Sequence, residues 1–113
     1  MSLVPDIAVF EWSRIPLLDN GRIANQFEIA PDWTIEILSP RQSPNRVIRN
    51  IMFSIQNGTK LGWFFDSEDE SIMVFQPNQV PDIKQGDDIL PVLDVLEGWD
   101  LSVADIFNCL NFG

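Results

Sequence analysis

A helical pattern between two strand patterns constrains the fold of this chain more than any other feature. Residues 44–57 form the helical pattern, whose apolar residues recur at a 3–4 spacing: Val47, Ile48, Ile51, Met52 and Ile55. Ser43 suits the N-cap position and Pro44 suits the first helical position. Residues 33–38 and 60–65 are rich in β-branched and aromatic side chains, which predicts strands. Together they predict a sheet with a crossover helix.

Shorter patterns complete the predicted architecture. Further strands are expected at 6–10 and 71–76, with an acidic hairpin turn at 66–70 and weaker extended segments at 80–83 and 89–93. A long connection at 11–31 contains a hairpin turn at Asn20-Gly21. A last helix begins at the cap Ser102, which is followed by the capping-box acid Asp105, and ends at Leu110. No internal repeat or linker divides the chain. The sequence therefore predicts one α/β (α+β) domain, residues 1–113, with a mixed β-sheet and flanking helices.

The chain is strongly acidic. Aspartate and glutamate number 17 and lysine and arginine number 7, which gives a formal net charge of −10 over 113 residues. Nucleic-acid-binding proteins are usually basic, because contacts with phosphates supply most of their affinity. Three arginines nevertheless lie close together in the sequence: Arg41, Arg46 and Arg49. They predict either a nucleic-acid-binding surface or a solvated helix face that balances nearby acids, and the sequence leaves both open.

The residue types that are absent or rare exclude several kinds of chemistry. The chain has no histidine, which excludes Ser–His and Cys–His nucleophilic catalysis and a histidine-ligated zinc site. Its one cysteine, Cys109, lies in an apolar segment and predicts a buried thiol. Any metal site would use carboxylates, which suit hard cations such as Mg²⁺ or Mn²⁺. With no membrane-spanning run and no leader pattern, we expect a cytoplasmic protein with no membrane partner.

Two acidic residues in strand patterns are the candidates for such a site. Glu36 lies inside an apolar strand pattern, where a carboxylate is costly unless a cation or hydrogen-bond donors satisfy it. The alternative is a half-exposed edge strand with Glu36 in water. Asp6 opens the first strand pattern, where a strand-end or turn role is the alternative. Asp32 repeats the Pro-Asp pair just before the second strand, and we interpret it as a turn residue or as a support beside the site.

Four segments carry a resemblance to a known family: VPDIAV at 4–9, PDWTIEILSP at 31–40, NG at 57–58 and GWFFD at 62–66. They resemble the Uma-type family of restriction endonucleases, formerly a domain of unknown function, in the PD-(D/E)XK nuclease superfamily. The resemblance covers most of the chain, and its most specific parts are the Pro-Asp strand and the Glu-Ile-Leu-Ser-Pro strand end. It implies a restriction-endonuclease-like fold, a mixed sheet flanked by helices.

The resemblance also implies a chemistry and a set of ligands. Proteins of this superfamily hold Mg²⁺ or Mn²⁺ with carboxylates, and the metal activates water against a phosphodiester of nucleic acid, here expected to be DNA. Carried over by motif, Asp6 is the first metal ligand and Glu36 the second. The backbone carbonyl of Ile37 would be a third ligand.

Two departures from the family pattern bear on activity. The superfamily places a lysine two residues after the second acid, where this chain has Leu38. The family carries its lysine on the following helix instead, where this chain has Arg49 or Asn50, so both are candidate catalytic residues. Arginine can stabilise negative charge but cannot act as a base. Family members also begin with a helix and strands that are missing here, which predicts uncovered apolar surface and a homodimer.

These observations leave two functional hypotheses, and whether the chain is an enzyme stays open. The first is a metal-dependent endonuclease, truncated or degenerate, that binds its metal weakly and turns over slowly or not at all. The second is a non-catalytic interaction or assembly domain that retains the nuclease fold. The acidic charge, the missing lysine and three candidate surface aromatics, Trp12, Trp63 and Trp99, favour the second.

Overall fold

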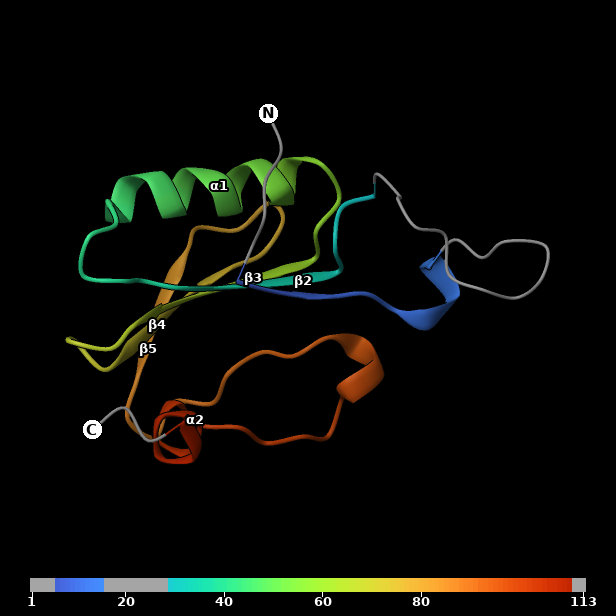
Figure 1. Ribbon diagram of the computed structural model, residues 1–113. Helices are drawn as coiled ribbons and strands as arrows, with labels where there is room; N and C mark the ends of the chain where they lie inside the picture. The colour runs from blue at the N-terminus through green and yellow to red at the C-terminus, as the bar shows by residue number, and fades with distance from the viewer. Residues whose placement is uncertain (1–5, 16–28, 111–113) are drawn as a thin grey trace.

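A five-stranded sheet forms the centre of the computed structural model, which describes residues 6–15 and 29–110. The strands lie side by side in chain order (Figure 1). They are β1 (Ile7–Val9), β2 (Trp33–Ile37), β3 (Leu61–Asp66), β4 (Ser71–Phe75) and β5 (Asp82–Gln85). Among these strands, β2 and β3 pair in parallel and the other neighbours pair antiparallel. The predicted mixed sheet is confirmed.

Helix α1 (Pro44–Gln56) connects the two parallel strands and lies across one face of the sheet (Figure 1). Val47 and Ile51 are its buried residues, and they pack against Phe64 of β3 and Phe75 of β4. Ile48 and Ile55 contribute partly buried contacts to the same cluster. The crossover helix and its apolar face are therefore as the 3–4 spacing predicts.

A glycine in β3 allows α1 to approach the sheet closely. A Cβ atom at Gly62 would lie 2.5 Å from Cγ2 of Ile51 and 3.6 Å from Cγ2 of Thr34. The first of these separations is well inside normal van der Waals contact between carbon atoms. A side chain at position 62 would therefore push α1 away from β3.

The opposite face of the sheet carries a larger core, which is covered by the C-terminal part of the chain. Trp33, Trp63 and Phe65 face this side and pack with Leu90 and Val103. The covering segment contains the 3-10 helix η2 (Asp94–Leu96) and the helix α2 (Val103–Leu110), both of which lie below the sheet in Figure 1. The sheet is thus the middle layer of three.

The cap predicted for the last helix is present. The Asp105 N–H donates to the Ser102 hydroxyl at 3.1 Å, and the Ser102 N–H donates to the Asp105 carboxylate at 3.3 Å. This reciprocal pair satisfies two backbone donors at the beginning of α2, as a capping box should.

Two expectations about exposure are wrong. Trp63 is only 2% exposed because it points from a central strand into the larger core, so it is not a surface aromatic. Trp12 and Trp99 are exposed, as expected. Cys109 is exposed rather than buried. The short helix α2 covers the sheet with one side only, and Cys109 is not on that side. Met52 is 45% exposed, at the margin of the apolar face of α1.

Two of the weaker sequence patterns form different structures from those predicted. β5 begins at Asp82, later than the extended segment expected at 80–83. The segment 89–93 forms an isolated bridge between Ile89 and Ser102 in place of a strand. The long connection contains a 3-10 helix, η1 (Trp12–Arg14), and the hairpin expected at Asn20-Gly21 lies outside the described residues.

Candidate metal-binding site

The antiparallel register of β1 and β2 places Asp6 directly opposite Glu36. Ile7 pairs with Ile35, so the residue before the first and the residue after the second face one another. Opposite residues of an antiparallel pair project to the same face, with Cβ atoms ~4.5–5.5 Å apart. The negative charge of Asp6 acts on Glu36 strongly enough to help raise the pKa of its carboxyl group. The register therefore puts the two acids opposite one another, and their role as joint metal ligands stays a prediction.

The surroundings of Glu36 make its negative charge costly. Glu36 lies on the α1 face of the sheet and pairs in register with the buried Phe64 of β3. Burial first, and the negative charge of Asp6 second, raise the pKa of Glu36 to about 7. A cation between the two carboxylates would relieve both effects, because it would solvate Glu36 and offset the repulsion from Asp6.

A backbone hydrogen bond orients the Asp6 carboxylate. The Ile37 N–H donates to Oδ2 of Asp6 at 2.7 Å, although Asp6 itself is exposed. The N–H and the C=O of one strand residue point to the same side of the strand. The Ile37 carbonyl is therefore expected to face the side on which Asp6 lies, which is where the third predicted ligand is needed.

The donor set fits a hard cation with several bound waters. Within residues 6–15 and 29–110 there is no group of three or more histidine, cysteine, aspartate and glutamate side chains that could hold a metal. Mg²⁺ commonly binds proteins through one or two carboxylates and keeps several waters. The Asp6–Glu36 pair matches that requirement, and its oxygen-only chemistry suits Mg²⁺ or Mn²⁺.

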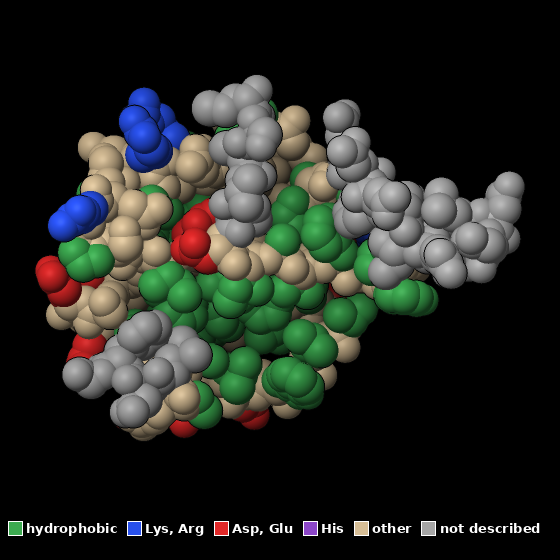
Figure 2. Space-filling model, viewed as in Figure 1, with side chains coloured by type: hydrophobic (Ala, Val, Ile, Leu, Met, Phe, Trp, Pro, Cys, Tyr) green, Lys and Arg blue, Asp and Glu red, His purple; other side chains and the backbone are tan. Residues whose placement is uncertain are grey.

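The predicted basic surface lies around the start of α1. Arg41 precedes the helix, and Arg46 and Arg49 lie three residues apart on it, so they share one side. All three are exposed, and none forms an ion pair with another described residue. Figure 2 shows Lys and Arg side chains gathered over the end at which α1 begins. Asn50 is half-buried, and no direct hydrogen bond joins it or Arg49 to the described carboxylate pair.

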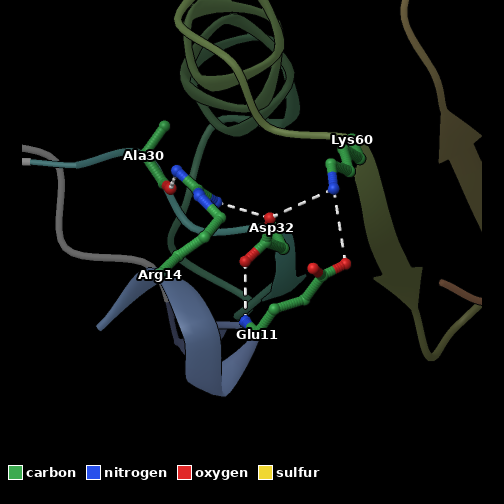
Figure 3. Close-up of polar contacts among 5 residues, drawn as sticks. All are labelled: Glu11, Arg14, Ala30, Asp32 and Lys60. Atoms are coloured by element: carbon green, nitrogen blue, oxygen red, sulfur yellow. Dashed lines mark hydrogen bonds and ion pairs between the residues drawn. The ribbon is translucent and has the colours of Figure 1, made fainter. Parts of the chain in front are cut away.

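A buried carboxylate at the other end of β2 has more partners than its sequence position suggests. Asp32 is completely buried, and its carboxylate accepts the Glu11 N–H at 2.7 Å and an N–H of the Arg14 guanidinium (Figure 3). Nζ of Lys60 lies 3.7 Å from Asp32 and 3.3 Å from Glu11. Burial would raise the pKa of Asp32, but these hydrogen bonds and cations outweigh it and lower the pKa.

The turn interpretation of Asp32 was incomplete. Its position before β2 is as predicted, but its partners Arg14 and Lys60 lie far away in the sequence, where no local pattern connects them. The cluster of Glu11, Arg14, Asp32 and Lys60 is named here the Asp32 cluster.

Comparison with solved structures identifies the class of the domain. The crystal structure of a "putative nuclease belonging to DUF820" from Anabaena variabilis ATCC 29413 matches with a TM-score of 0.90 and 46% sequence identity. The match covers 96% of this chain and 61% of that chain, so this chain spans less than two thirds of the neighbour's length. The domain has the α+β fold of a nuclease.

The family is equally clear. The model of the family described as "Uma2: Putative restriction endonuclease" matches residues 1–104, and the chain belongs to this family. The resemblance found in the sequence is therefore confirmed. No curated protein matches the chain.

Replacing Glu36 by glutamine should stabilise the metal-free protein at alkaline pH. Because the folded-state pKa of about 7 lies above the ordinary value of 4.5, the native state keeps a proton that the unfolded state releases. The free energy of unfolding therefore falls as the pH rises from 4.5, the ordinary pKa, to about 7, the pKa in the folded state. We expect Glu36→Gln to be more stable than the unaltered chain by about 1–2 kcal/mol at pH 8. Each pH unit between the two pKa values corresponds to ~1.4 kcal/mol, and solvent screening of the half-buried Glu36 reduces the total.

Urea unfolding with a chelator, at pH 4 and pH 8, measures this difference. The stabilisation should be present at pH 8 and absent near pH 4, where the glutamate is protonated in both states. Glu97→Gln, at an exposed position, is the matched control and should change stability little at either pH. Equal stability of Glu36→Gln and the unaltered chain at pH 8 would contradict the electrostatic account of the site.

Proposed function

We propose that this chain is a metal-dependent phosphodiesterase of nucleic acid, with DNA as the expected substrate and slow turnover. The observation that carries the proposal is the pair of carboxylates, Asp6 and Glu36, held opposite one another on neighbouring strands. Membership of a restriction endonuclease family and the nuclease fold support it. No described helix is long and apolar enough to cross a membrane.

A separate structural feature supports each proposed ligand. Asp6 is oriented by the Ile37 N–H, Glu36 is fixed by the register of β2, and the Ile37 carbonyl would complete the set. A bound Mg²⁺ or Mn²⁺ would supply Lewis acidity and an activated water. Deprotonated Glu36 is the form that binds a cation, so the site should favour metal at pH values above 7.

The arginines around the start of α1 would bind phosphates and orient the substrate. Arg41, Arg46 and Arg49 are exposed and unpaired among the described residues, so their donors are available. Arg49 or Asn50 replaces the lysine that the family pattern implies. Arginine can stabilise developing negative charge but cannot take up a proton, and losing one such stabilising donor costs ~10²–10³ in rate. Slow turnover follows from this replacement.

A non-catalytic interaction domain is the competing function. The exposed side chains of Trp12 (68%) and Trp99 (59%) favour it, because exposed aromatics are enriched in interfaces. The net charge of −10 also favours it over nucleic-acid binding. The two functions differ in whether the carboxylate pair binds metal.

Metal titration and DNA cleavage distinguish the two functions. We expect the unaltered chain to bind Mn²⁺ weakly and to cut supercoiled or single-stranded DNA slowly, and Glu36→Gln to lose both activities. Glu97→Gln should keep them. If the lysine position is the cause of the slow rate, Arg49→Lys or Asn50→Lys should raise the rate, by up to ~10²–10³.

Each other outcome has a definite meaning. Rapid cutting by the unaltered chain that Glu36→Gln abolishes would show that the existing residues already replace the lysine. Cutting that survives Glu36→Gln would contradict the assigned site. Absence of metal binding in every variant would favour the interaction domain.

We also propose that the chain forms a homodimer. Ile7 of the edge strand β1 is 46% exposed, and its neighbours Val9, Ile35 and Ile37 are only partly buried. Figure 2 shows apolar side chains in a continuous band between the sheet and the C-terminal segment. In a chain with a net charge of −10, an uncharged band is where two copies can meet without strong repulsion. Exposed apolar bands of this kind are typical of protein interfaces.

Sedimentation equilibrium tests the homodimer. The unaltered chain should sediment as a dimer at micromolar concentration, and Ile7→Lys should shift it toward monomer because it buries a charge in the interface. Val80→Lys is the control, since Val80 is 88% exposed beside the other edge strand, β5. A monomeric unaltered chain, or an Ile7→Lys variant that stays dimeric, would exclude this interface.

A further inference from the structure

The strand that follows Asp6 is too short for its ladder alone to fix its register. β1 has three residues, and its ladder with β2 has three pairs. A shift of one residue in a β-ladder moves every side chain to the other face of the sheet. Asp6 would then leave the α1 face and lose its position opposite Glu36. Contacts outside the three pairs must therefore help to hold the register. The Ile37 N–H bond to Asp6 is one of them, at the exposed end of the pair.

Asp32 holds the other end of the same strand pair. Its backbone N–H donates to the Val9 carbonyl at 2.9 Å, and its carboxylate accepts the Glu11 N–H at 2.7 Å. Its carbonyl accepts the N–H groups of Lys60 and Leu61, at 3.0 and 3.2 Å, where β3 begins. One residue therefore connects the end of β1, the beginning of β2 and the beginning of β3.

The charge of Asp32 makes this connection specific to one register. Asp32 is completely buried, and the described groups around its carboxylate are the Glu11 N–H, the Arg14 guanidinium and the Lys60 ammonium. Arg14 also donates to the Ala30 carbonyl at 3.0 Å, which holds η1 beside the start of β2. A shifted strand would move Glu11 and Arg14 away and leave a buried carboxylate without enough partners, which is strongly unfavourable.

Asp32 cannot act on the metal by contact. Glu36 lies four positions after Asp32, which corresponds to roughly 13 Å along an extended strand. Its influence on the site must therefore pass through the pairing of β1 with β2.

We propose that Asp32 is a positioning residue that fixes the register of β1 on β2 and so holds Asp6 opposite Glu36. The predicted effect on metal affinity rests on the proposed function, whereas the predicted effect on strand register does not. Residues that orient metal ligands commonly change metal affinity by ~10–100-fold when they are replaced.

Two variants and one cross-link test the proposal, all in a Cys109→Ser background. Asp32→Ala removes the carboxylate, and Asp32→Asn keeps the size and one oxygen acceptor but loses the charge. The cross-link is a disulfide between Ala8→Cys and Thr34→Cys, which are directly opposite in the ladder. Opposite residues lie ~4.5–5.5 Å apart between Cα atoms, within the usual range of disulfides.

The first readout is the strand register, from cross-strand nuclear Overhauser contacts between β1 and β2 without metal. We expect both Asp32 variants to lose or average the contacts between positions 7 and 35, and oxidation of the disulfide to restore them. Native contacts in Asp32→Ala would overturn the proposal, whether or not the protein binds metal. If Asp32→Ala does not fold, Asp32→Asn decides the question by the same criterion.

The second readout is the Mn²⁺ dissociation constant of the folded variants. We expect Asp32→Ala to weaken binding by ~10–100-fold, Asp32→Asn to weaken it less, and the oxidised disulfide to restore affinity. The disulfide in the presence of Asp32 should bind as the unaltered chain does. A variant with restored register and unrestored affinity would overturn the positioning role. Absence of Mn²⁺ binding in every protein, with the register lost on replacing Asp32, would refute the proposed function alone.

Discussion

The antiparallel pairing of β1 with β2 is the interaction on which the candidate site depends. It brings Asp6 and Glu36 to opposite positions, where burial and repulsion raise the pKa of Glu36 to about 7. Such a pair weakens the metal-free fold at neutral pH. At the other end of the same strands, Asp32 is buried beside Arg14 and has a lowered pKa, so its charge strengthens the fold. We propose that the first end binds a cation and that the second holds the strands in register.

Local patterns predicted the parts of the fold that depend on local periodicity. The helix at 44–57 and its flanking strands were found because apolar spacing is a property of neighbouring residues. Glu36 was found because an acid inside an apolar strand is unusual, and Asp6 through the family motif. The Asp32 cluster was missed because its ion pairs join segments that only the sheet brings together. The burial of Trp63 was missed for the same reason, since it depends on the C-terminal layer.

The distribution of charge around the site matters more than the total. Because β2 and β3 are parallel, the acidic turn at 66–70 leaves the sheet at the same end as Glu36. Asp66 is held within that turn, where its carboxylate accepts the N–H groups of Glu68 and Asp69, both at 3.1 Å. The exposed arginines also lie near this end, around the start of α1. A polyanion would meet both signs of charge there, which is consistent with weak binding.

The most direct test of the account is a carboxyl ¹³C titration of Glu36 by nuclear magnetic resonance, with and without Mg²⁺. We predict that Glu36 titrates near pH 7 in the metal-free protein, because it is half-buried opposite Asp6. We also predict that Mg²⁺ lowers the apparent pKa, because the cation competes with the proton. A Glu36 that titrates near its ordinary value of 4.5 and does not respond to Mg²⁺ would contradict the central claim.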